Sequence, residues 1–306
     1  MKLATTTSDF GSFCANDCER IGEIRAAGFR YVVLSQYSIK TNADLLLADD
    51  WRDTVARMKE TADRLGVTFV QSHSPGGNAL DPDPAKVDEL VAVTNRSIAV
   101  CAALGIPNTV VHAGFAKGIG KDEFFEKNAD FYRRLFPAME EYGVNVLVEN
   151  STRANMGSRY YLYTGADMKE FIDYVDHPLF HACWDTGHAN IEGGQAEQIR
   201  ALGSDLYALH INDNRGERDE HLIPYLGTVN MDDVMTALTE IGFEGPFTFE
   251  ASSVLRPSRY WLGNRREFAE VSPRLAEPTI AMQRDLERLM FHVGEHILCA
   301  YGLLED

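Results

Sequence analysis

Short apolar, β-rich runs alternate with segments of helical hydrophobic period along the whole chain. The predicted strands lie within residues 2–7, 29–37, 67–74, 108–115, 144–151, 179–190, 205–214 and 245–252. The predicted helices lie within residues 18–28, 51–66, 84–105, 122–143, 165–176, 194–204, 231–242 and 275–302. Strict alternation with strongly apolar strand runs is typical of a parallel sheet covered by helices on its outer face. The pattern therefore predicts an α/β fold, a (β/α)8 TIM barrel.

The same pattern bears on domain organisation. A doubly wound open sheet, the main alternative, would need a glycine-rich phosphate loop after the first strand, and the sequence has none there. Pro137 should bend or interrupt the helix of 122–143. No low-complexity linker divides the chain, so we expect one TIM-barrel domain over 1–306, with a long insertion at about 252–278 before the last helix. An insertion of this length is typical of a lid or a subunit contact.

Composition and charge narrow the class of protein. Apolar residues make up 45% of the chain and charged residues 25%, which is ordinary for a soluble globular protein. The sequence has no apolar run long enough to span a membrane and no secretory signal, so a cytoplasmic protein is expected. A formal charge of -17 argues against nucleic acids and anionic membranes as partners. The five cysteines are scattered without a CxxC pair, which argues against a disulfide framework and a thiolate zinc site.

Ionisable residues follow most of the predicted strands. They are His73, His112, Glu149, Asp185, His188, His210 and Glu250, together with Asp219 and His221 in the loop after the seventh strand. In a TIM barrel the carboxyl ends of the strands meet at one rim, and reactive groups lie there. A lone histidine at a strand end is usually a hydrogen-bonded structural residue. Convergence of so many ligand-type side chains on one rim predicts a functional site instead.

Two glutamates of this set follow runs that should be almost wholly buried. A carboxylate in such a place is costly to desolvate unless a cation or hydrogen-bond donors meet it. The central cluster that we expect is Glu149, Asp185, His210 and Glu250. Three carboxylates and one imidazole suit a divalent metal ion, with Mn²⁺ as the first choice and Mg²⁺, Co²⁺ or Zn²⁺ as alternatives. Asp185 is thus expected to bind metal, while His188 binds either substrate or a second metal.

The segment HINDNRGERDEHLIPYLGTVNMDDV, residues 210–234, is the most specific motif of the chain. A histidine at the end of the seventh strand is followed by an acidic, asparagine-rich turn, a His-Leu pair, a glycine-containing loop and an acidic helix start. This order resembles the sugar (phosphate) isomerase/epimerase family of the xylose isomerase-like TIM barrel superfamily, and the resemblance extends from the first strand to the eighth. It implies one divalent ion held by the central cluster. It also implies that His188 and Arg215 contact substrate oxygens, with His73 and His112 as further substrate contacts.

The chemistry that the resemblance implies is proton transfer at a carbon next to a carbonyl of a small-molecule sugar or sugar phosphate. The metal polarises the carbonyl and stabilises an enediolate, while Glu149 and Glu250 remove and return the proton in an order left open. We also expect a homo-oligomer. Some ketose 3-epimerases have a second carboxylate shortly after the glutamate of the fifth strand. This chain has Asn155 near that position, which counts against ketose 3-epimerisation as the particular reaction.

Two other functions fit the same residues. Endonuclease IV-like enzymes of the superfamily are trinuclear zinc phosphodiesterases with nine ligands, and the chain has a candidate for each. These candidates are His73, His112, Glu149, Asp185, His188, His210, Asp219, His221 and Glu250. The negative charge and the absence of a basic stripe interleaved with aromatic residues favour the sugar enzyme. The other alternative is a partner-dependent lyase or dehydratase subunit of a sugar-processing complex, with 252–278 as its interface.

Overall fold

The computed structural model of the chain describes residues 1–251, 254–255 and 278–305. Within these residues the strands are β1 (Leu3–Thr6), β2 (Tyr31–Ser35), β3 (Thr68–His73), β4 (Asn108–Val110), β5 (Asn145–Glu149), β6 (Phe180–Asp185), β7 (Leu206–His210) and β8 (Phe247–Thr248). Each strand lies inside the run in which the sequence predicts it.

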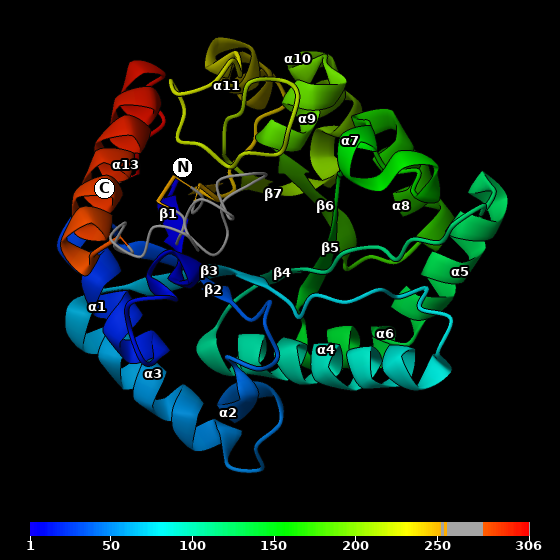
Figure 1. Cartoon of the computed structure of the whole chain (residues 1–306), viewed down its shortest axis with the longest axis horizontal. Helices are drawn as coiled ribbons and strands as arrows, with labels where there is room; N and C mark the ends of the chain where they lie inside the picture. Colours follow the sequence, from blue (N-terminus) through cyan, green and yellow to red (C-terminus); the bar gives the residue numbers. More distant parts are fainter. Residues whose placement is uncertain (252–253, 256–277, 306) are drawn as a thin grey trace, which may run out of the picture.

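The strands form one parallel sheet that curls into a barrel. Their order is β7-β6-β5-β4-β3-β2-β1-β8, so neighbours in sequence pair in space, and the first strand also pairs with the last. A parallel bridge between Ile211 and Phe249 joins the edges of β7 and β8, where the Ile211 N–H donates to the Thr248 carbonyl at 2.7 Å. The (β/α)8 TIM barrel predicted from the sequence is confirmed (Figure 1).

Helices surround the barrel (Figure 1). The α-helices of the described residues are α1 (Asp17–Ala27), α2 (Ala43–Leu46), α3 (Trp51–Leu65), α4 (Pro84–Leu104), α5 (Lys121–Arg133), α6 (Phe136–Tyr142), α7 (Arg153–Met156), α8 (Gly165–Val175), α9 (Thr186–Glu192), α10 (Gln195–Leu202), α11 (Met231–Glu240) and α13 (Ile280–Ala300). The 3-10 helices are η1 (Thr7–Phe10), η2 (Gly157–Arg159) and η3 (Gly203–Asp205). The helix predicted over 122–143 is interrupted between α5 and α6, and Pro137 lies in the first turn of α6, where its missing N–H has no helical partner to lose.

Side chains along each strand alternate between the barrel interior and the surrounding helices. The interior apolar residues are Ala4, Val33, Val70, Val110, Leu147, Cys183 and Ala208. The opposite face packs against the helices in one large core. Trp184 of β6 belongs to that core, and its Nε1–H donates to Oε1 of Gln195 in α10 at 3.2 Å. Because alternation sends Trp184 outward, it turns the next residue, Asp185, into the barrel.

In β3 one extra residue changes this alternation. Phe69 and Gln71 pair with consecutive residues of β2, which leaves Val70 unpaired. Such a β-bulge re-aims the side chains that follow it. Val70 belongs to the interior cluster, and Gln71 also faces the interior, where it contacts His210 of β7.

A second bulge lies in β7. Leu206 and Ala208 pair with consecutive residues of β6, which leaves Tyr207 unpaired. Leu206 packs against the helices, whereas Ala208 belongs to the interior cluster. The shift in phase places His210, two residues after Ala208, on the interior side as well.

Two expectations on organisation stay predictions. The insertion expected at 252–278 lies outside the described residues, apart from 254–255 and 278, and the single-domain assignment rests on the sequence. A membrane-crossing helix would have to be long and strongly apolar, and the described part of the chain contains no such helix.

Candidate active site

Four ligand-type side chains converge at the carboxyl ends of β5, β6, β7 and β8. One nitrogen or oxygen atom of each lies within 4.8 Å of the corresponding atoms of the others, and the residues are Glu149, Asp185, His210 and Glu250. We call these residues the central group. The structure thus brings together all four side chains that the sequence predicted as one cluster.

The imidazole of His210 lies between two carboxylates of the central group. Its Nδ1 is 3.0 Å from Oε1 of Glu149 and 3.1 Å from Oε2 of Glu250. Burial alone would raise the pKa of Glu149, but His210 and His112 outweigh burial and hold that pKa well below its usual value. Glu149 is therefore a carboxylate that needs positive charge or hydrogen-bond donors around it.

Asp185 belongs to the central group and also begins a helix. Its Oδ1 accepts from the His188 N–H at 2.6 Å as the N-cap of α9, and its Oδ2 accepts from Nδ2 of Asn212 at 2.6 Å. Complete burial raises the pKa of Asp185 to about 6. Gly187 permits this turn, because a Cβ there would lie 1.8 Å from Oδ1 of Asn212. The turn therefore combines a structural cap with a ligand-type carboxylate.

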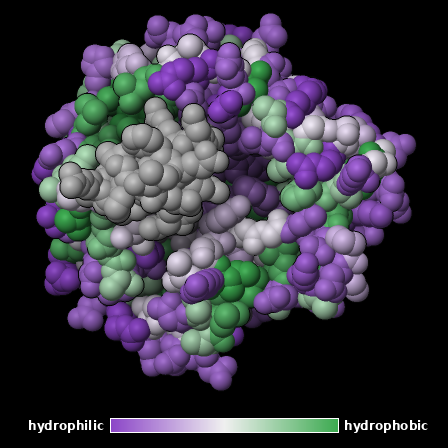
Figure 2. Space-filling view, viewed as in Figure 1, coloured by the Kyte–Doolittle hydropathy of each residue, from purple (hydrophilic) through white to green (hydrophobic). Residues whose placement is uncertain are grey.

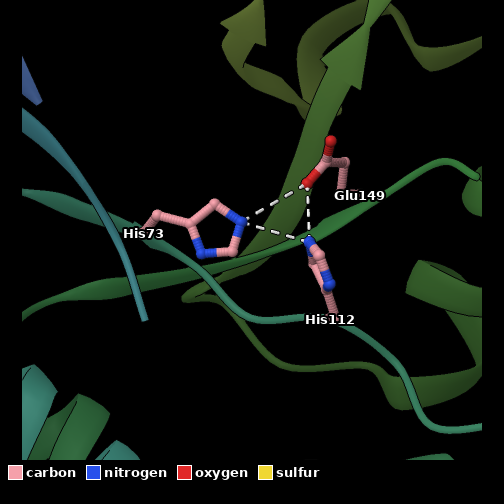
Figure 3. Close-up of side chains that lie close together, drawn as sticks. All are labelled: His73, His112 and Glu149. Carbon is pink, nitrogen blue, oxygen red and sulfur yellow. Dashed lines mark hydrogen bonds and ion pairs between the residues drawn. The ribbon is translucent and has the colours of Figure 1, made fainter. Parts of the chain in front are cut away.

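A second group shares Glu149 with the first. Oε2 of Glu149 is 3.0 Å from Nε2 of His112 and 3.9 Å from Nε2 of His73, and the two imidazole Nε2 atoms are 3.1 Å apart (Figure 3). Burial and the neighbouring His112 lower the pKa of His73 to about 4. His73 and His112 thus present nitrogen atoms to the oxygen of Glu149 that does not face His210.

A third group comes from α9 and the loop after β7. Oδ2 of Asp219 is 3.2 Å from Nε2 of His188, and its Oδ1 is 3.1 Å from Nε2 of His221. Burial alone would lower the pKa of His221, but the hydrogen bond with Asp219 raises it to about 9. His221 has a φ of 50°, a left-handed conformation that is uncommon for a non-glycine residue and concentrates at functional sites.

Three histidines of these groups are held in the same way. The outer Nδ1 contacts a main-chain carbonyl oxygen in each case: Ser74 O for His73 at 2.9 Å, Asn150 O for His188 at 2.9 Å and Glu250 O for His221 at 2.8 Å. A carbonyl accepts a proton and never donates one, so Nδ1 carries the hydrogen. Each ring consequently directs Nε2 at its group, which is the usual orientation of metal-binding imidazoles.

All members of the three groups except Asp185 line one cavity of about 650 Å³. Figure 2 shows a hollow near the centre of this view of the molecule, with hydrophilic residues in its wall. Tyr37 also lines the cavity, with its ring 5.2 Å from that of His73, and is half exposed. A cavity of this volume is large enough for a small-molecule ligand.

Two residues singled out in the sequence have other surroundings. Arg215 is largely exposed, does not line the cavity and pairs with Oε1 of Glu220 at 2.5 Å. Asn155 does line the cavity, and its Nδ2 donates to Oδ2 of Asp219 at 3.1 Å. The role of Arg215 in substrate binding stays a prediction. Sequence reasoning did not single out Gln71 and Tyr37, because neither is a ligand-type residue at a strand end.

The chemistry of the central group fits a divalent cation. Three carboxylates surround one imidazole, and Glu149, Asp185 and His210 are all almost completely buried. Buried carboxylates at this density are unfavourable unless positive charge lies among them. The oxygen-rich donor set suits Mn²⁺ or Mg²⁺, and the more imidazole-rich second and third groups suit Zn²⁺.

Comparison with known proteins identifies related sequences. A family model described as xylose isomerase-like TIM barrel matches residues 21–270. An uncharacterized protein, y4fM from Sinorhizobium fredii, is 30% identical over 184 residues, and the match spans 56% of each chain. The L-ribulose 3-epimerase of a Methylomonas species is 29% identical over 223 residues, which cover 69% of this chain and 73% of that enzyme. A probable endonuclease 4 of a Geobacter species is 30% identical over 179 residues, 51% of this chain and 62% of that protein.

Solved structures share the fold over nearly the full length. The D-psicose 3-epimerase of Clostridium cellulolyticum H10, determined with D-tagatose, superposes with a TM-score of 0.76 at 20% identity and covers 97% of this chain and 99% of its own. At that identity the likeness concerns the fold. Sugar epimerases are a kind of isomerase, and they occur among both the sequence relatives and the structural neighbours.

Proposed function

Because the chain belongs to the xylose isomerase-like TIM barrel family, we propose that it is a divalent-metal-dependent sugar isomerase or epimerase. The observation that carries this proposal is the central group, in which Glu149 and Glu250 both contact Nδ1 of His210 at the cavity. The epimerase relatives make ketoses the first substrate class to test.

The two glutamates are suited to move a proton. One carboxylate removes the proton from the carbon next to the substrate carbonyl, and the electron pair of the C–H bond moves toward the carbonyl oxygen. The other carboxyl group, which takes its proton from the solvent, delivers it to the same carbon from the opposite face, which inverts that carbon. A divalent ion held by the central group would supply Lewis-acid stabilisation of the negative charge on the substrate oxygens.

Other residues of the cavity are assigned to binding. His188 directs Nε2 into the third group and lines the cavity, so we assign it to substrate oxygens, with His73 and His112 in the same role from the opposite wall. Asn155 replaces the carboxylate that some ketose 3-epimerases have near this position. For that reason the proposal covers isomerisation and epimerisation of ketoses without specifying carbon 3.

Incubation with a ketose in deuterated water tests the proton transfer. We expect one carbon-bound deuterium in the product, because the carboxyl group that delivers the proton has taken it from the solvent. NMR and mass spectrometry of the recovered sugar measure this, with unmodified and phosphorylated ketoses, inososes and hydroxypyruvate as substrates and Mn²⁺ present. Product formation without any label, or no reaction with the whole panel, contradicts the proposal.

A zinc-dependent phosphodiesterase is the second candidate. The observation that favours it is the assembly of three ligand groups, two of which share Glu149, together with relatives named probable endonuclease 4. The formal charge of -17 opposes binding to DNA.

Metal analysis separates the two candidates. After dialysis against Mn²⁺ we expect about one ion per chain, because only the central group offers the carboxylate-rich donors that Mn²⁺ prefers among the described residues. Elemental mass spectrometry gives the ratio of metal to protein. Close to three zinc ions per chain, accompanied by cleavage of DNA at abasic sites, would replace the sugar reaction with the phosphodiesterase.

A further inference from the structure

Gln71 is a buried residue of β3 that contacts His210 of the central group from within the barrel. It is fully buried, and its Nε2 lies 3.0 Å from Nε2 of His210 across the barrel. Its Oε1 is buried and has no hydrogen-bond partner. A buried amide with only one of its two polar ends engaged is costly, and the engaged end of Gln71 meets His210 of the central group.

The two bulges of the sheet produce this contact. Strict alternation along β3 would place Gln71 on the face of Phe69, which packs against the helices. Strict alternation along β7 would likewise place His210 on the face of Leu206. Gln71 and His210 would then not both face the barrel interior. Bulges next to active sites commonly re-aim a particular side chain, and here both partners of one contact depend on a bulge.

His210 is held differently from three other imidazoles that line the cavity. His73, His188 and His221 each have a main-chain carbonyl at the outer Nδ1 and direct Nε2 at their group. His210 is reversed: Nδ1 faces Glu149 and Glu250, and its outer atom is Nε2. The group at this outer nitrogen is the side-chain amide of Gln71.

An amide can do what a carbonyl cannot, since it offers an acceptor at one end and a donor at the other. When Nδ1 of His210 carries the proton, that N–H donates to the two glutamates, and the bare Nε2 accepts from the amide nitrogen of Gln71. When Nδ1 binds a cation, a neutral imidazole must carry its proton on Nε2, which then needs an acceptor. Half a turn of the amide about its terminal bond brings the oxygen of Gln71 to that place.

We propose that Gln71 is the positioning residue of His210, presenting its amide oxygen to the Nε2–H when Nδ1 binds a divalent cation and its amide nitrogen to Nε2 when Nδ1 is protonated. This inference rests on the metal site of the proposed function. It accounts for a glutamine at this position, because a carboxylate or a main-chain carbonyl could only accept from Nε2–H, the state in which Nδ1 binds the cation.

Binding of Mn²⁺ tests the proposal without any turnover. Gln71→Met keeps the length of the side chain and removes the amide, and we expect a dissociation constant for Mn²⁺ about 10- to 100-fold higher. Gln71→Glu keeps an oxygen acceptor in either protonation state, and we expect an affinity within about threefold of the original. Free Mn²⁺ is measured by electron paramagnetic resonance, with circular dichroism to establish folding.

The matched control is Gln36→Met. Gln36 is equally buried, but its Nε2 donates to Ser72 and Ser97 outside the cavity lining, at 3.0 and 2.9 Å. We expect unchanged Mn²⁺ binding in this variant. Unaltered affinity in Gln71→Met, or an affinity in Gln71→Glu as weak as in a folded Gln71→Met, overturns the proposal. Absence of Mn²⁺ binding by the unsubstituted protein would instead contradict the proposed function on which it rests.

Discussion

Replacing Glu149 by glutamine is expected to lower kcat for the sugar reaction by about 10²- to 10⁴-fold, the range of positioned acid–base groups. The reason is the double contact of this side chain, whose Oε1 is 3.0 Å from His210 and whose Oε2 is 3.0 Å from His112. Glutamine keeps the shape but has neither the negative charge nor the ability to take up a proton. Steady-state kinetics on the ketose with the highest wild-type rate measures the loss.

A matched control for this variant lies on the outside of the barrel. Glu140 contacts a histidine in the same way, with Oε1 3.2 Å from Nε2 of His177, but its carboxylate is exposed and does not line the cavity. Glu140→Gln should retain the original kcat. We expect Glu250→Gln to resemble Glu149→Gln, and original rates in both Glu149→Gln and Glu250→Gln would rule out the assignment of the two glutamates.

Replacing Trp184 by alanine is expected to lower the free energy of unfolding by about 3–5 kcal/mol. Trp184 is among the largest completely buried side chains of the described residues, and its removal leaves a cavity between β6 and α10 and deprives Gln195 of a donor. Urea unfolding followed by circular dichroism measures the change. A loss below about 1 kcal/mol would mean that the neighbouring helices close the cavity.

Trp184→Phe provides the comparison. It retains most of the buried area, although the phenyl ring is smaller than the indole and lacks its N–H, so we expect a loss of about 1–2 kcal/mol. Because Trp184 faces the helices and Asp185 faces the barrel, the phenylalanine variant should still bind Mn²⁺ as the original protein does. If Trp184→Phe lost Mn²⁺ binding while its free energy of unfolding stayed unchanged, the face of β6 that packs against the helices would be coupled to the face that bears Asp185.

The barrel and its central group could be predicted because both follow from the hydrophobic periods of strands and helices along the sequence. Strands that are buried on both faces are apolar throughout, and apolar residues of helices recur about every 3.6 positions. The alternation of strands and helices can therefore be predicted without knowing any contact between distant residues. Parallel strands place their carboxyl ends at one rim, which is sufficient to bring Glu149, Asp185 and Glu250 together. The opposite orientations of Trp184 and Asp185 can be predicted from the two-residue period of a strand.

The bulges could not be predicted, and the role of Gln71 depends on them. A bulge has no compositional signature in VTFVQSH, since Val70 and Gln71 would be assigned to opposite faces by strict alternation. The periodicity likewise does not predict α2, α7 or α9, because one or two turns do not establish a period. Arg215 illustrates a different limit: its distance from the cavity is set by the path of its loop and by its pairing with Glu220.

Among the described residues, β7 and β8 are joined by one isolated parallel bridge. β8 has two residues, and Ile211 and Phe249 form the bridge to β7. Ile211 directly follows His210 and Phe249 directly precedes Glu250, so this bridge lies next to two side chains of the central group. A cation bound by both side chains would link β7 to β8 beside this bridge, and its removal would leave the two strands joined there by main-chain hydrogen bonds alone.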